Sequence, residues 1–481
     1  MKIIFLGGNM VLSNLPCKEK SIFSFFEEIS MIPRVSGNTK PIADYLEGFA
    51  KEKGLKYYRD SADNVVIYKA ASVGHESRPT LILQGHTDMV GAVAEGVDHD
   101  FSKEGVHLIV DGDFIRADGT TLGADNGSAV AYMLSLLAAD DVPHPALECV
   151  FTSDEETGLF GATALDGSVL SGRTMINLDS GGEGTFIAGC AGGVRIDITP
   201  NLDWNERREN GFCITLGGFK GGHSGEDIDK GRLNAIKEIS AILSRIDGVL
   251  ISELTGGTAD NVIATNATAK IVCEKTKEQI ERAIADDVTR IKSVECGTEI
   301  SICECECERA LTSESTVALL CLINALPYGI QAMSREMEGL VETSDNLGVI
   351  KVTDRCDTLS ISVRSSVNAD KLALADKIEK IAESFGASHR RRGDYPGWRY
   401  DSNSKIRELM CRIFKESYGK DPSVMAIHAG LECGLFLGKL EGLDCISMGP
   451  DNYDIHSVKE CLSISSFERT YEYIKKILKE I

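Results

Sequence analysis

The sequence contains no apolar run long enough to form a membrane-spanning helix. Its apolar segments are short and interrupted by charged residues, whereas a helix that crosses a bilayer needs roughly 20 apolar residues. Basic residues are also scarce: the formal net charge is −22, and the one dense basic cluster is Arg390-Arg391-Arg392, which we interpret as a solvated loop. Nucleic acids and anionic membranes bind basic patches, so we expect no nucleic-acid and no membrane partner.

The sequence also lacks the cysteine pattern of a disulfide-stabilised protein. Its fifteen cysteines are odd in number and scattered along the chain, which favours reduced thiols and a cytoplasmic location. The one dense group, Cys303, Cys305 and Cys307, alternates with glutamates. Strict alternation is typical of a strand, so we expect the cysteines to face a core and the carboxylates to face solvent. We favour this interpretation over a thiolate metal site.

No clear targeting signal opens the chain. Residues 1–6 contain one lysine and a short apolar run, without a small-residue cleavage site. Three interpretations remain, namely an edge strand, a weak signal sequence, or sequence upstream of a start at Met10, and we treat the segment as non-functional. Gly7-Gly8 is not sufficient for a nucleotide-binding loop, because the third glycine and the following helix are missing.

What the sequence does contain is a globular composition, 43% apolar and 26% charged, in a chain long enough for two or three domains. From about Lys18 onward, strand-like apolar runs alternate with helix-like periods, as in a largely parallel sheet covered on both faces. The expected strands are 64–68, 80–84, 147–152 and 174–178, and the expected helices are 22–28, 40–53 and 126–139.

After Gly192-Gly193 the pattern becomes that of alternating strands with intervening helices. The expected strands are 212–216, 261–273, 299–307, 348–353 and 358–363, and the expected helices are 233–246, 277–294, 316–326 and 371–385. From about Gly397 the earlier style returns, with a helix at 406–418 and a strand at 443–448. The chain therefore predicts an α/β catalytic domain of residues 1–191 and 397–481, with a mixed, mostly parallel sheet, and an inserted α+β domain of residues 192–396.

Side chains that can bind metal gather at the ends of the expected strands. They are His86 and Asp88 after one strand, Asp125 at the start of a helix, Glu155 and Glu156 after the next strand, Asp179 after another, and His456 near the C-terminus. Ligands collect at the carboxyl ends of the strands in open α/β sheets. We therefore expect these side chains to meet at one edge of one sheet.

This set of side chains suits a pair of zinc ions. Imidazole and carboxylate are both zinc ligands, and one carboxylate can bridge two cations about 3.5–4 Å apart. Asp125, at a tight turn where a helix begins, is placed to bridge. His86 and Asp179 would complete one zinc site, and Glu156 and His456 the other.

Two further carboxylates are expected to act beside the ions. Asp88 is two residues from His86 and is placed to hold the other N–H of that imidazole. Glu155 and Glu156 are adjacent and cannot point the same way from an extended backbone. We therefore expect one of them to bind metal while its neighbour takes the proton of a water held between the ions.

These segments closely resemble the zinc-dependent dipeptidase/aminoacylase/carboxypeptidase superfamily. The shared segments, in order, are 85–88, 123–127, 154–158, 177–180, 222–225 and 456–457. Two further segments, 189–193 and 427–434, are similar to those of one branch, the aminoacyl-histidine dipeptidases, also described as Xaa-His or carnosinase-like dipeptidases. The resemblance spans roughly residues 18–481.

The resemblance implies a di-zinc exopeptidase-like catalytic domain with Asp125 as the bridging ligand. The full set of zinc ligands that it implies is His86, Asp125, Glu156, Asp179 and His456. It also implies that Glu155 is the general base, that Asp88 orients a ligand, and that the peptide bond after Asp125 is cis. The inserted domain would act as a lid, and His223 from this lid would stabilise the tetrahedral oxyanion.

Four positions are implied to contact the substrate. Asn261 and Arg364 match lid positions that hold the substrate backbone or its C-terminal carboxylate, for which an arginine fork is well shaped. His428 and Glu432 are expected to line the substrate pocket, with Glu432 facing a free N-terminal amine.

The implied activity is hydrolysis of small peptides, with Xaa-His dipeptides as the expected substrates. A tripeptidase, a metallocarboxypeptidase and an aminoacylase are the alternatives within the superfamily, and a binding protein without turnover is the alternative outside it. The resemblance also implies two Zn²⁺ ions, for which Mn²⁺ or Co²⁺ are possible substitutes, and a homodimer formed through the lid.

Overall fold

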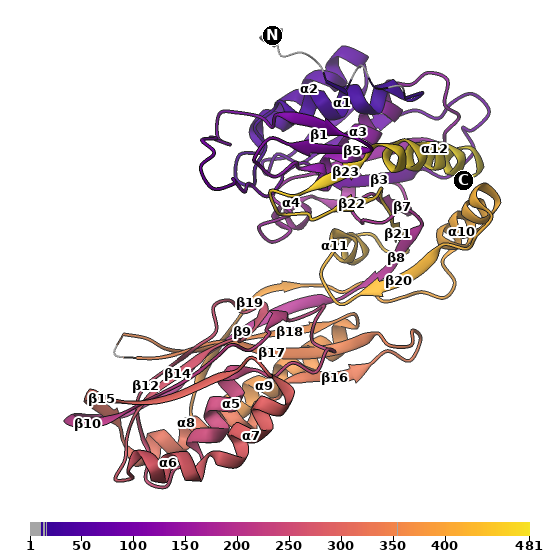
Figure 1. Ribbon diagram of the computed structural model, residues 1–481. Helices are drawn as coiled ribbons and strands as arrows, with labels where there is room; N and C mark the ends of the chain where they lie inside the picture. The colour runs from indigo at the N-terminus through magenta and orange to yellow at the C-terminus, as the bar shows by residue number, and fades with distance from the viewer. Residues whose placement is uncertain (1–10, 13–14, 16, 354) are drawn as a thin grey trace. The chain divides into compact units, whose positions relative to one another are not determined.

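The computed structural model describes residues 11–12, 15, 17–353 and 355–481. The interpretations of residues 1–10 given above lie outside this described part. The chain divides into two compact units, whose elements are labelled in Figure 1. Unit 1 combines the N-terminal part of the chain through Gly189 with Tyr400–Ala426 and Leu431–Ile481, and unit 2 combines Cys190–Arg399 with Ile427–Gly430.

Unit 1 is built around an eight-stranded mixed sheet. In spatial order its strands are β1 (Lys56–Arg59), β2 (Val65–Lys69), β6 (Leu147–Thr152), β3 (Leu81–His86), β7 (Thr174–Asn177), β21 (Asp444–Ser447), β8 (Thr185–Cys190) and β20 (Ser423–Ile427). Parallel pairing joins the four central strands β6, β3, β7 and β21. The pairs β1–β2, β2–β6 and β8–β21 are antiparallel. The mixed sheet expected from the sequence is therefore confirmed, with its parallel part at the centre.

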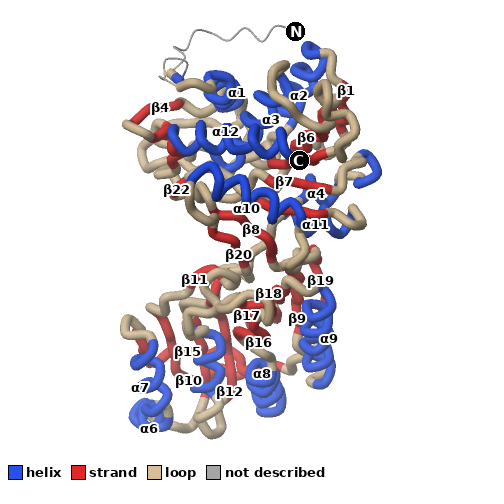
Figure 2. The backbone as a smooth tube through the Cα atoms, turned by 90° about the vertical axis from the view of Figure 1, so that its right-hand side faces the viewer, coloured by secondary structure: helices blue, strands red, loops and turns tan. Residues whose placement is uncertain are grey.

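Two of the central strands are buried along their whole length. Every residue of β3 and β6 is buried, as expected for strands that are covered on both faces. The helices of unit 1 surround these strands, as Figure 2 shows. They are α1 (Lys20–Ser30), α2 (Lys40–Lys53), α3 (Ala124–Ala138), α4 (Phe160–Ala164), α10 (Lys405–Tyr418), α11 (Glu432–Lys439) and α12 (Ile464–Glu480), with a 3₁₀ turn at Gly167–Val169.

The last helix of the chain completes a core that the first helix begins. Phe467 of α12 packs against Phe23 and Phe26 of α1, with ring centroids 5.4 and 5.8 Å apart, and against Tyr132 of α3 at 4.7 Å. Aromatic rings at these separations contribute packing energy beyond the apolar area that they bury. The N-terminal and C-terminal segments of unit 1 are therefore held in one core.

A second, four-stranded sheet of unit 1 carries one of the expected site residues. Its order is β22 (Asn452–Tyr453), β23 (Cys461–Ser463), β5 (Phe114–Ala117) and β4 (Leu108–Asp111). β22 and β23 form a hairpin, and His456 lies in its loop. The expectation that every site residue follows a strand of one sheet is therefore wrong for His456. The chain leaves β21 at Ser447 and forms β22, the first strand of this separate hairpin, before it reaches His456.

Unit 2 is an α+β structure with a nine-stranded sheet. In spatial order its strands are β15 (Glu299–Leu311), β10 (Trp204–Gly217), β14 (Ala267–Val272), β12 (Leu250–Gly256), β17 (Val341–Val352), β18 (Asp357–Ser365), β9 (Gly192–Thr199) and β19 (Ser388–Tyr395), and β16 (Gly329–Met333) pairs with β17. Two short strands, β11 (Gly222–His223) and β13 (Val262–Ile263), form a separate pair.

The helices of unit 2 lie on one face of this sheet (Figure 1). They are α5 (Ala235–Leu243), α6 (Lys277–Ala283), α7 (Ala285–Val294), α8 (Ser313–Ala325) and α9 (Asn368–Ser384). Together with the covered face of the sheet they bury a core composed mainly of isoleucine and leucine. The pairings within the sheet are antiparallel, so one covered face and one open face are the expected arrangement.

Two elements that the sequence predicts as continuous are interrupted. The expected strand 261–273 is divided into β13 and β14, and the expected helix 277–294 is divided into α6 and α7. At the helix break Ile284 leaves the helical conformation, with φ −102° and ψ 1°. Ile280, Ile284 and Ile291 are all buried and keep a helical spacing across the break. The apolar period therefore could not reveal the interruption.

The basic cluster Arg390-Arg391-Arg392 is not a loop but part of strand β19. Arg390 and Arg392 pair with Asp197 on the neighbouring strand β9. Arg391 points to the other face, as alternation in a strand requires, and contacts Glu379 of α9 at 2.5 Å. Acidic partners on both faces thus neutralise the only dense run of basic residues.

The alternating cysteines form a strand as expected, but they do not all face a core. Cys307 is buried, Cys305 is half-buried and Cys303 is exposed. The prediction is therefore confirmed for Cys307 and wrong for Cys303. The reason is that β15 is an edge strand, and its neighbour Ile302, on the opposite face from Cys303, is the residue that joins the helix-covered core.

Among the described residues, no helix is both long enough and apolar enough to span a bilayer.

Candidate active site

The expected metal-binding side chains in unit 1 lie where ordered elements end or begin. His86 is the last residue of β3, Glu155 and Glu156 follow β6, and Asp179 follows β7. Asp125 lies in the first turn of α3, two residues after Gly123, whose φ of +71° is a left-handed conformation that favours glycine. The ends of parallel strands and the start of a helix thus carry five of these residues, including the neighbouring pair of glutamates.

Asp125 lies between two histidines. Its Oδ1 is 3.1 Å from His86 Nε2, and its Oδ2 is 3.3 Å from His456 Nε2. A second carboxylate, Asp179, approaches the same atom of His86, with its Oδ1 3.5 Å from Nε2. Glu156 does the same at His456, with its Oε1 3.0 Å from Nε2. The arrangement has two halves, each with one imidazole and one outer carboxylate, and Asp125 is shared by both.

The electrostatics of this cluster favour positive charge. Hydrogen bonds with Asp125 and Glu156 raise the pKa of His456 to about 10. Burial opposes protonation of His86, but Asp179 and Asp125 raise the pKa of His86 well above its ordinary value. Burial raises the pKa of Asp179 to about 7, although His86 opposes this rise. Buried carboxylates that draw protons onto nearby imidazoles are a suitable environment for cations.

The donor atoms fit divalent cations. One atom from each of His86, Asp125 and Glu156 lies within 4.8 Å of the other two, and Asp179 and His456 are each within 3.5 Å of a member of that group. Imidazole nitrogen and carboxylate oxygen are ligands that zinc, manganese and cobalt accept. A carboxylate with one oxygen toward each half also has the form of a bridging ligand.

Asp88 holds more than the imidazole for which it was predicted. Its carboxylate Oδ1 lies 3.5 Å from His86 Nδ1, and its backbone oxygen lies closer, at 3.1 Å. The carboxylate also accepts hydrogen bonds from the backbone N–H groups of Glu155 at 3.0 Å and Glu156 at 3.3 Å, and from the hydroxyl of Ser36 at 2.8 Å. It therefore fixes the turn that carries both glutamates.

Glu155 lies in a cluster of negative charge. Burial raises its pKa well above the ordinary range, and Asp179, Glu432 and Glu156 raise it further, whereas His86 lowers it. A carboxylate with a raised pKa is a stronger base than an exposed one. The local chemistry is therefore that of a proton acceptor beside the imidazole–carboxylate cluster.

Asn126 ties the start of α3 to the ends of two strands. The peptide bond between Asp125 and Asn126 is cis, as the resemblance implied. The Asn126 side chain donates a hydrogen bond to the backbone oxygen of Leu178 at 2.9 Å. A Cβ atom at Gly85 would lie 2.3 Å from Asn126 Oδ1, so only glycine fits before His86. The glycine of the Gly85-His86 motif thus has a packing reason.

A second group of predicted residues meets within unit 2. Arg364 Nη2 lies 3.3 Å from His223 Nε2, and His428 Nε2 lies 2.7 Å from the hydroxyl of Ser344. Burial and Arg364 lower the pKa of His223, and burial, Arg364 and His223 together lower the pKa of His428 to about 3. Both shifts favour the neutral imidazole, and the Arg364 guanidinium beside these rings is buried. Its Nε atom has no hydrogen-bond partner among the described residues.

Tyr395 is a member of this group that the sequence analysis missed. Arg364 Nη1 donates to its hydroxyl at 3.5 Å. A Cβ atom at Gly193 would lie 2.7 Å from that hydroxyl oxygen, and one at Gly430 would lie 2.9 Å from the ring. The two glycine-containing segments that distinguish the aminoacyl-histidine branch thus both make room for this ring. Gly193 and Gly430 were the feature of the sequence that could have indicated a bulky side chain packed against these segments.

Two predicted substrate-binding residues behave differently from the rest. Glu432, at the start of α11, has no exposed surface, and its Oε2 accepts hydrogen bonds from Gln84 and from Thr152. This burial argues against the predicted contact with a substrate amine, because the carboxylate is held inside unit 1. Asn261 is half-buried, and its backbone oxygen accepts from the N–H of Ser224, beside His223.

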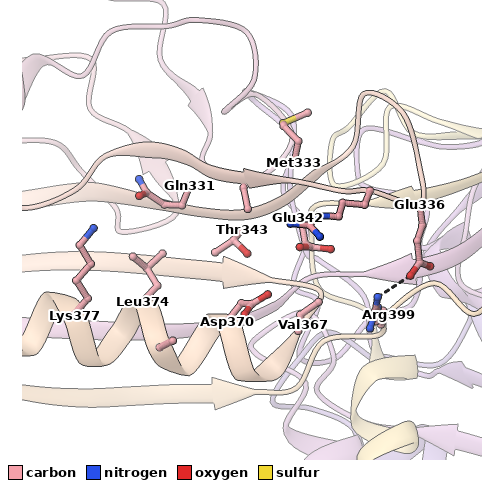
Figure 3. A pocket seen from close by; sticks show the side chains of 13 residues that line it. Gln331, Met333, Glu336, Glu342, Thr343, Val367, Asp370, Leu374, Lys377 and Arg399 are labelled. Carbon is pink, nitrogen blue, oxygen red and sulfur yellow. Dashed lines mark hydrogen bonds and ion pairs between the residues drawn. The ribbon is translucent and has the colours of Figure 1, made fainter.

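A groove of about 780 Å³ is present elsewhere in unit 2 (Figure 3). It lies between the β16–β17 strands and the start of α9, where Gln331, Thr343, Asp370 and Lys377 contribute polar lining. None of the predicted site residues is among the described residues that line it. We therefore assign it no part in the chemistry of the site.

The fold and site together define a peptidase class. The model of peptidase family M20/M25/M40 matches residues 82–480, so the chain belongs to this family. The cytosol non-specific dipeptidase of Escherichia coli (strain K12) is 35% identical over 474 residues, covering 96% of this chain and 97% of that protein.

A solved relative has nearly the same fold throughout. The aminoacylhistidine dipeptidase of Vibrio alginolyticus matches with a TM-score of 0.88 and 32% identity, covering 98% of each chain. An aminopeptidase of Bacillus cereus has a TM-score of 0.57 at 16% identity, covering 96% of this chain and 99% of that one. The latter similarity shows the shared fold alone.

Proposed function

We propose that this protein hydrolyses the peptide bond of dipeptides, with Xaa-His dipeptides among its substrates, at a site that holds two zinc ions. The observation that carries this proposal is the position of Asp125 between His86 and His456, with Asp179 and Glu156 as the outer carboxylates. Membership in peptidase family M20/M25/M40 supports the reaction class.

The proposed metal ligands divide into two sets with one shared member. His86 and Asp179 would hold one ion, Glu156 and His456 would hold the other, and Asp125 would be a ligand of both. Zinc suits this nitrogen and oxygen donor set, and manganese or cobalt can replace it there. When bound, such a pair of ions acidifies a water molecule and polarises the carbonyl of the scissile bond.

The residues of the chain then move one proton and hold the substrate. Glu155 accepts the proton of the attacking water and later donates it to the leaving amine. Asp88 keeps Glu155 and the His86 imidazole in place through its hydrogen bonds. We assign oxyanion stabilisation to His223, recognition of the C-terminal carboxylate to Arg364, and substrate contacts to Asn261 and His428.

The substrate class rests on the two most similar relatives reported above. One is named a non-specific dipeptidase and the other an aminoacylhistidine dipeptidase. A dipeptidase that accepts Xaa-His among other dipeptides is consistent with both names. The tripeptidase, metallocarboxypeptidase and aminoacylase alternatives remain rival proposals, and the first test below separates them.

We further propose a cytoplasmic location and a homodimer. The location is supported by the odd number and scattered spacing of the fifteen cysteines, and by the name of the Escherichia coli relative. The homodimer, and the role of residues 192–396 as a lid, are supported by the family resemblance.

A substrate panel tests the reaction. Metal-depleted protein is given zinc, manganese or cobalt and assayed with Xaa-His dipeptides, other dipeptides, tripeptides and N-acetyl amino acids. We expect hydrolysis of dipeptides only after metal is restored, with zinc effective. Preferred cleavage of tripeptides or N-acetyl amino acids would replace this proposal by one of its rivals.

A single substitution tests the general base. Glu155→Gln keeps the size of the side chain but removes the proton acceptor, so we expect kcat to fall by roughly 10²–10⁴-fold. The zinc content, measured by atomic absorption, should stay at two ions per chain. Glu148→Gln is the matched control. Glu148 lies near the start of β6, the strand that precedes Glu155, and this variant should keep full turnover. Retained activity in Glu155→Gln would show that another group is the base.

A further inference from the structure

A buried arginine lies behind the cluster in unit 1 without belonging to it. Arg34 follows α1 and is only 2% exposed. Its Nη1 donates to the backbone oxygens of Thr87 at 3.0 Å and Asp88 at 3.4 Å, and its Nη2 donates to that of Gly123 at 2.5 Å. One guanidinium thus joins the segment after His86 to the segment before Asp125.

A buried carboxylate holds the second of these segments from its N–H side. Glu460, in the hairpin loop that follows His456, is 3% exposed. Its Oε2 accepts hydrogen bonds from the N–H groups of Leu122 and Gly123, both at 2.9 Å, and its Oε1 accepts from the N–H of Asp125 at 3.2 Å. The turn that carries Asp125 is therefore held from two sides. Glu460 accepts hydrogen bonds from its N–H groups, and Arg34 donates to its Gly123 carbonyl group.

Two glycines make this arrangement possible. A Cβ atom at Gly123 would lie 2.7 Å from Arg34 Nη2, and one at Gly127 would lie at the same distance from that atom. Gly123 also needs its left-handed φ of +71°. The Gly123-Ala124-Asp125-Asn126-Gly127 motif is thus shaped around the guanidinium as well as around Asp125.

The charges of the two residues act on each other across this turn. Burial lowers the pKa of Arg34 to about 10, and Glu460 opposes this shift more than Asp88 and Asp125 do. Buried charges are kept in proteins where they are paired and hydrogen-bonded. The hydrogen bonds of both residues described above go to backbone groups, so their role is exerted through the backbone.

We propose that Arg34 and Glu460 are positioning residues that set metal affinity by fixing the backbone of the His86 and Asp125 segments in their liganding geometry. This inference rests on the proposed two-metal function. Outer residues that orient metal ligands typically change metal affinity or activity by about 10–100-fold when they are replaced. His456 and Glu460 lie four residues apart in the loop between β22 and β23. The same hairpin therefore supplies one imidazole of the cluster and the carboxylate that holds the Asp125 turn.

The test compares metal affinity in three variants. Glu460→Gln keeps the shape but places an amide against backbone N–H donors, and Arg34→Lys keeps the charge but loses the fork that reaches both segments. Glu148→Gln is the matched control, because Glu148 is 4% exposed and also holds backbone N–H groups, those of Ser171 and Gly172, before the start of β7. Zinc affinity is measured by competition with a chromophoric chelator, and the stability of each metal-free variant by urea unfolding.

We expect Glu460→Gln and Arg34→Lys to bind zinc about 10–100-fold more weakly than wild type, while Glu148→Gln binds it as wild type does. Excess zinc should restore kcat in both variants, with KM unchanged, because the substrate contacts are intact. Equal zinc affinity in Glu460→Gln and Glu148→Gln at similar metal-free stability would overturn this inference alone. If wild type bound no zinc and hydrolysed no dipeptide, both the proposed function and this inference would fail.

Discussion

At the scale of single residues, short motifs predict which side chains carry chemistry but not everything those side chains touch. His86, Asp125 and Asp179 stand at the ends of apolar runs with glycine or a small residue nearby, so they can be read from the sequence. The bonds from Asp88 to the N–H groups of Glu155 and Glu156 cannot, because they join segments 67 and 68 residues apart. The burial of Glu432 is likewise set by neighbours distant in the sequence, Gln84 of β3 and Thr152 of β6.

Asp345 is a buried carboxylate of unit 2 that was not predicted. Its Oδ1 accepts a hydrogen bond from Gln331 at 2.9 Å, and its Oδ2 has no hydrogen-bond partner among the described residues. Burial raises the pKa of Asp345 to about 7, although Lys237 opposes the rise. The folded protein therefore favours the protonated carboxyl group, and this contribution to stability is lost as pH rises from the unfolded pKa near 3.8 through 7.

We predict that Asp345→Asn becomes more stabilising, relative to wild type, as pH rises. Asparagine keeps an acceptor for Gln331 and cannot ionise, so the difference in unfolding free energy should grow by at most about 4 kcal/mol between pH 4 and pH 8. Urea unfolding at these two pH values measures it. Asp229→Asn, an exposed control, should show no such change. A pH-independent difference for Asp345→Asn would mean that the carboxylate is ionised in the folded protein throughout this range.

At the scale of elements, the start of strand β9 shows why a glycine is required. Gly193 pairs with Arg364 of β18 and with Tyr395 of β19, so a side chain there would push on the ring that contacts the guanidinium. By contrast, a Cβ atom at Gly217, at the end of β10, would have no heavy atom within 4 Å among the described residues, and the φ of Gly217 is not positive. Alanine at Gly193 should therefore disturb the contact between Tyr395 and Arg364, whereas alanine at Gly217 should not.

We predict that Gly193→Ala raises KM for dipeptides by about tenfold and changes kcat by less than about twofold. The reason is that displacement of Tyr395 removes a hydrogen bond from a charged group that we assign to carboxylate recognition, a loss of about 1.5–3 kcal/mol at most. Steady-state kinetics with an Xaa-His dipeptide measure the change, and Gly217→Ala is the control. An unchanged KM would show that Tyr395 does not support Arg364 during binding.

Helices and strands were predictable where buried residues recur at a regular spacing. They were not predictable where the chain bends within a helix or strand. The expected strand 147–152 has the bounds of β6, and the expected strand 80–84 falls two residues short of the end of β3 at His86; both strands are buried throughout. The break at Ile284 leaves the apolar spacing intact, and the alternating cysteines of β15 lie on an open face that only the sheet order reveals. The hairpin that brings His456 to the cluster was also missed, because its two strands have only two and three residues.

At the scale of the whole molecule, the chemistry is divided between the two units. All five proposed metal ligands and Glu155 belong to unit 1, whereas His223, Arg364, His428 and Tyr395 belong to unit 2. Each group is held by contacts within its own unit, as the distances above show. Metal binding should therefore depend on unit 1 alone, while the substrate contacts assigned to unit 2 are not needed for it.

We predict that zinc, added without peptide, slows amide hydrogen exchange in unit 1 but not in unit 2. A ligand that binds only the folded state stabilises it by about 2.7 kcal/mol at a hundred times its Kd. Exchange followed by mass spectrometry should show protection in peptides around 84–90, 120–128, 153–160, 176–182 and 454–462. Peptides from β15 should exchange at the same rate with and without zinc. Protection confined to unit 2, or absent everywhere, would contradict the ligand assignment.

The hairpin between β22 and β23 has a consequence for how the protein is made. His456 and Glu460 are both supplied by this loop, so a chain still emerging from the ribosome has neither until the loop between β22 and β23 has been made. Until then the growing polypeptide offers Asp125 with one imidazole and without the anion that holds its turn. Capture of the metal pair, and with it any capacity to cut peptides, should therefore wait until this hairpin has been synthesised and folded.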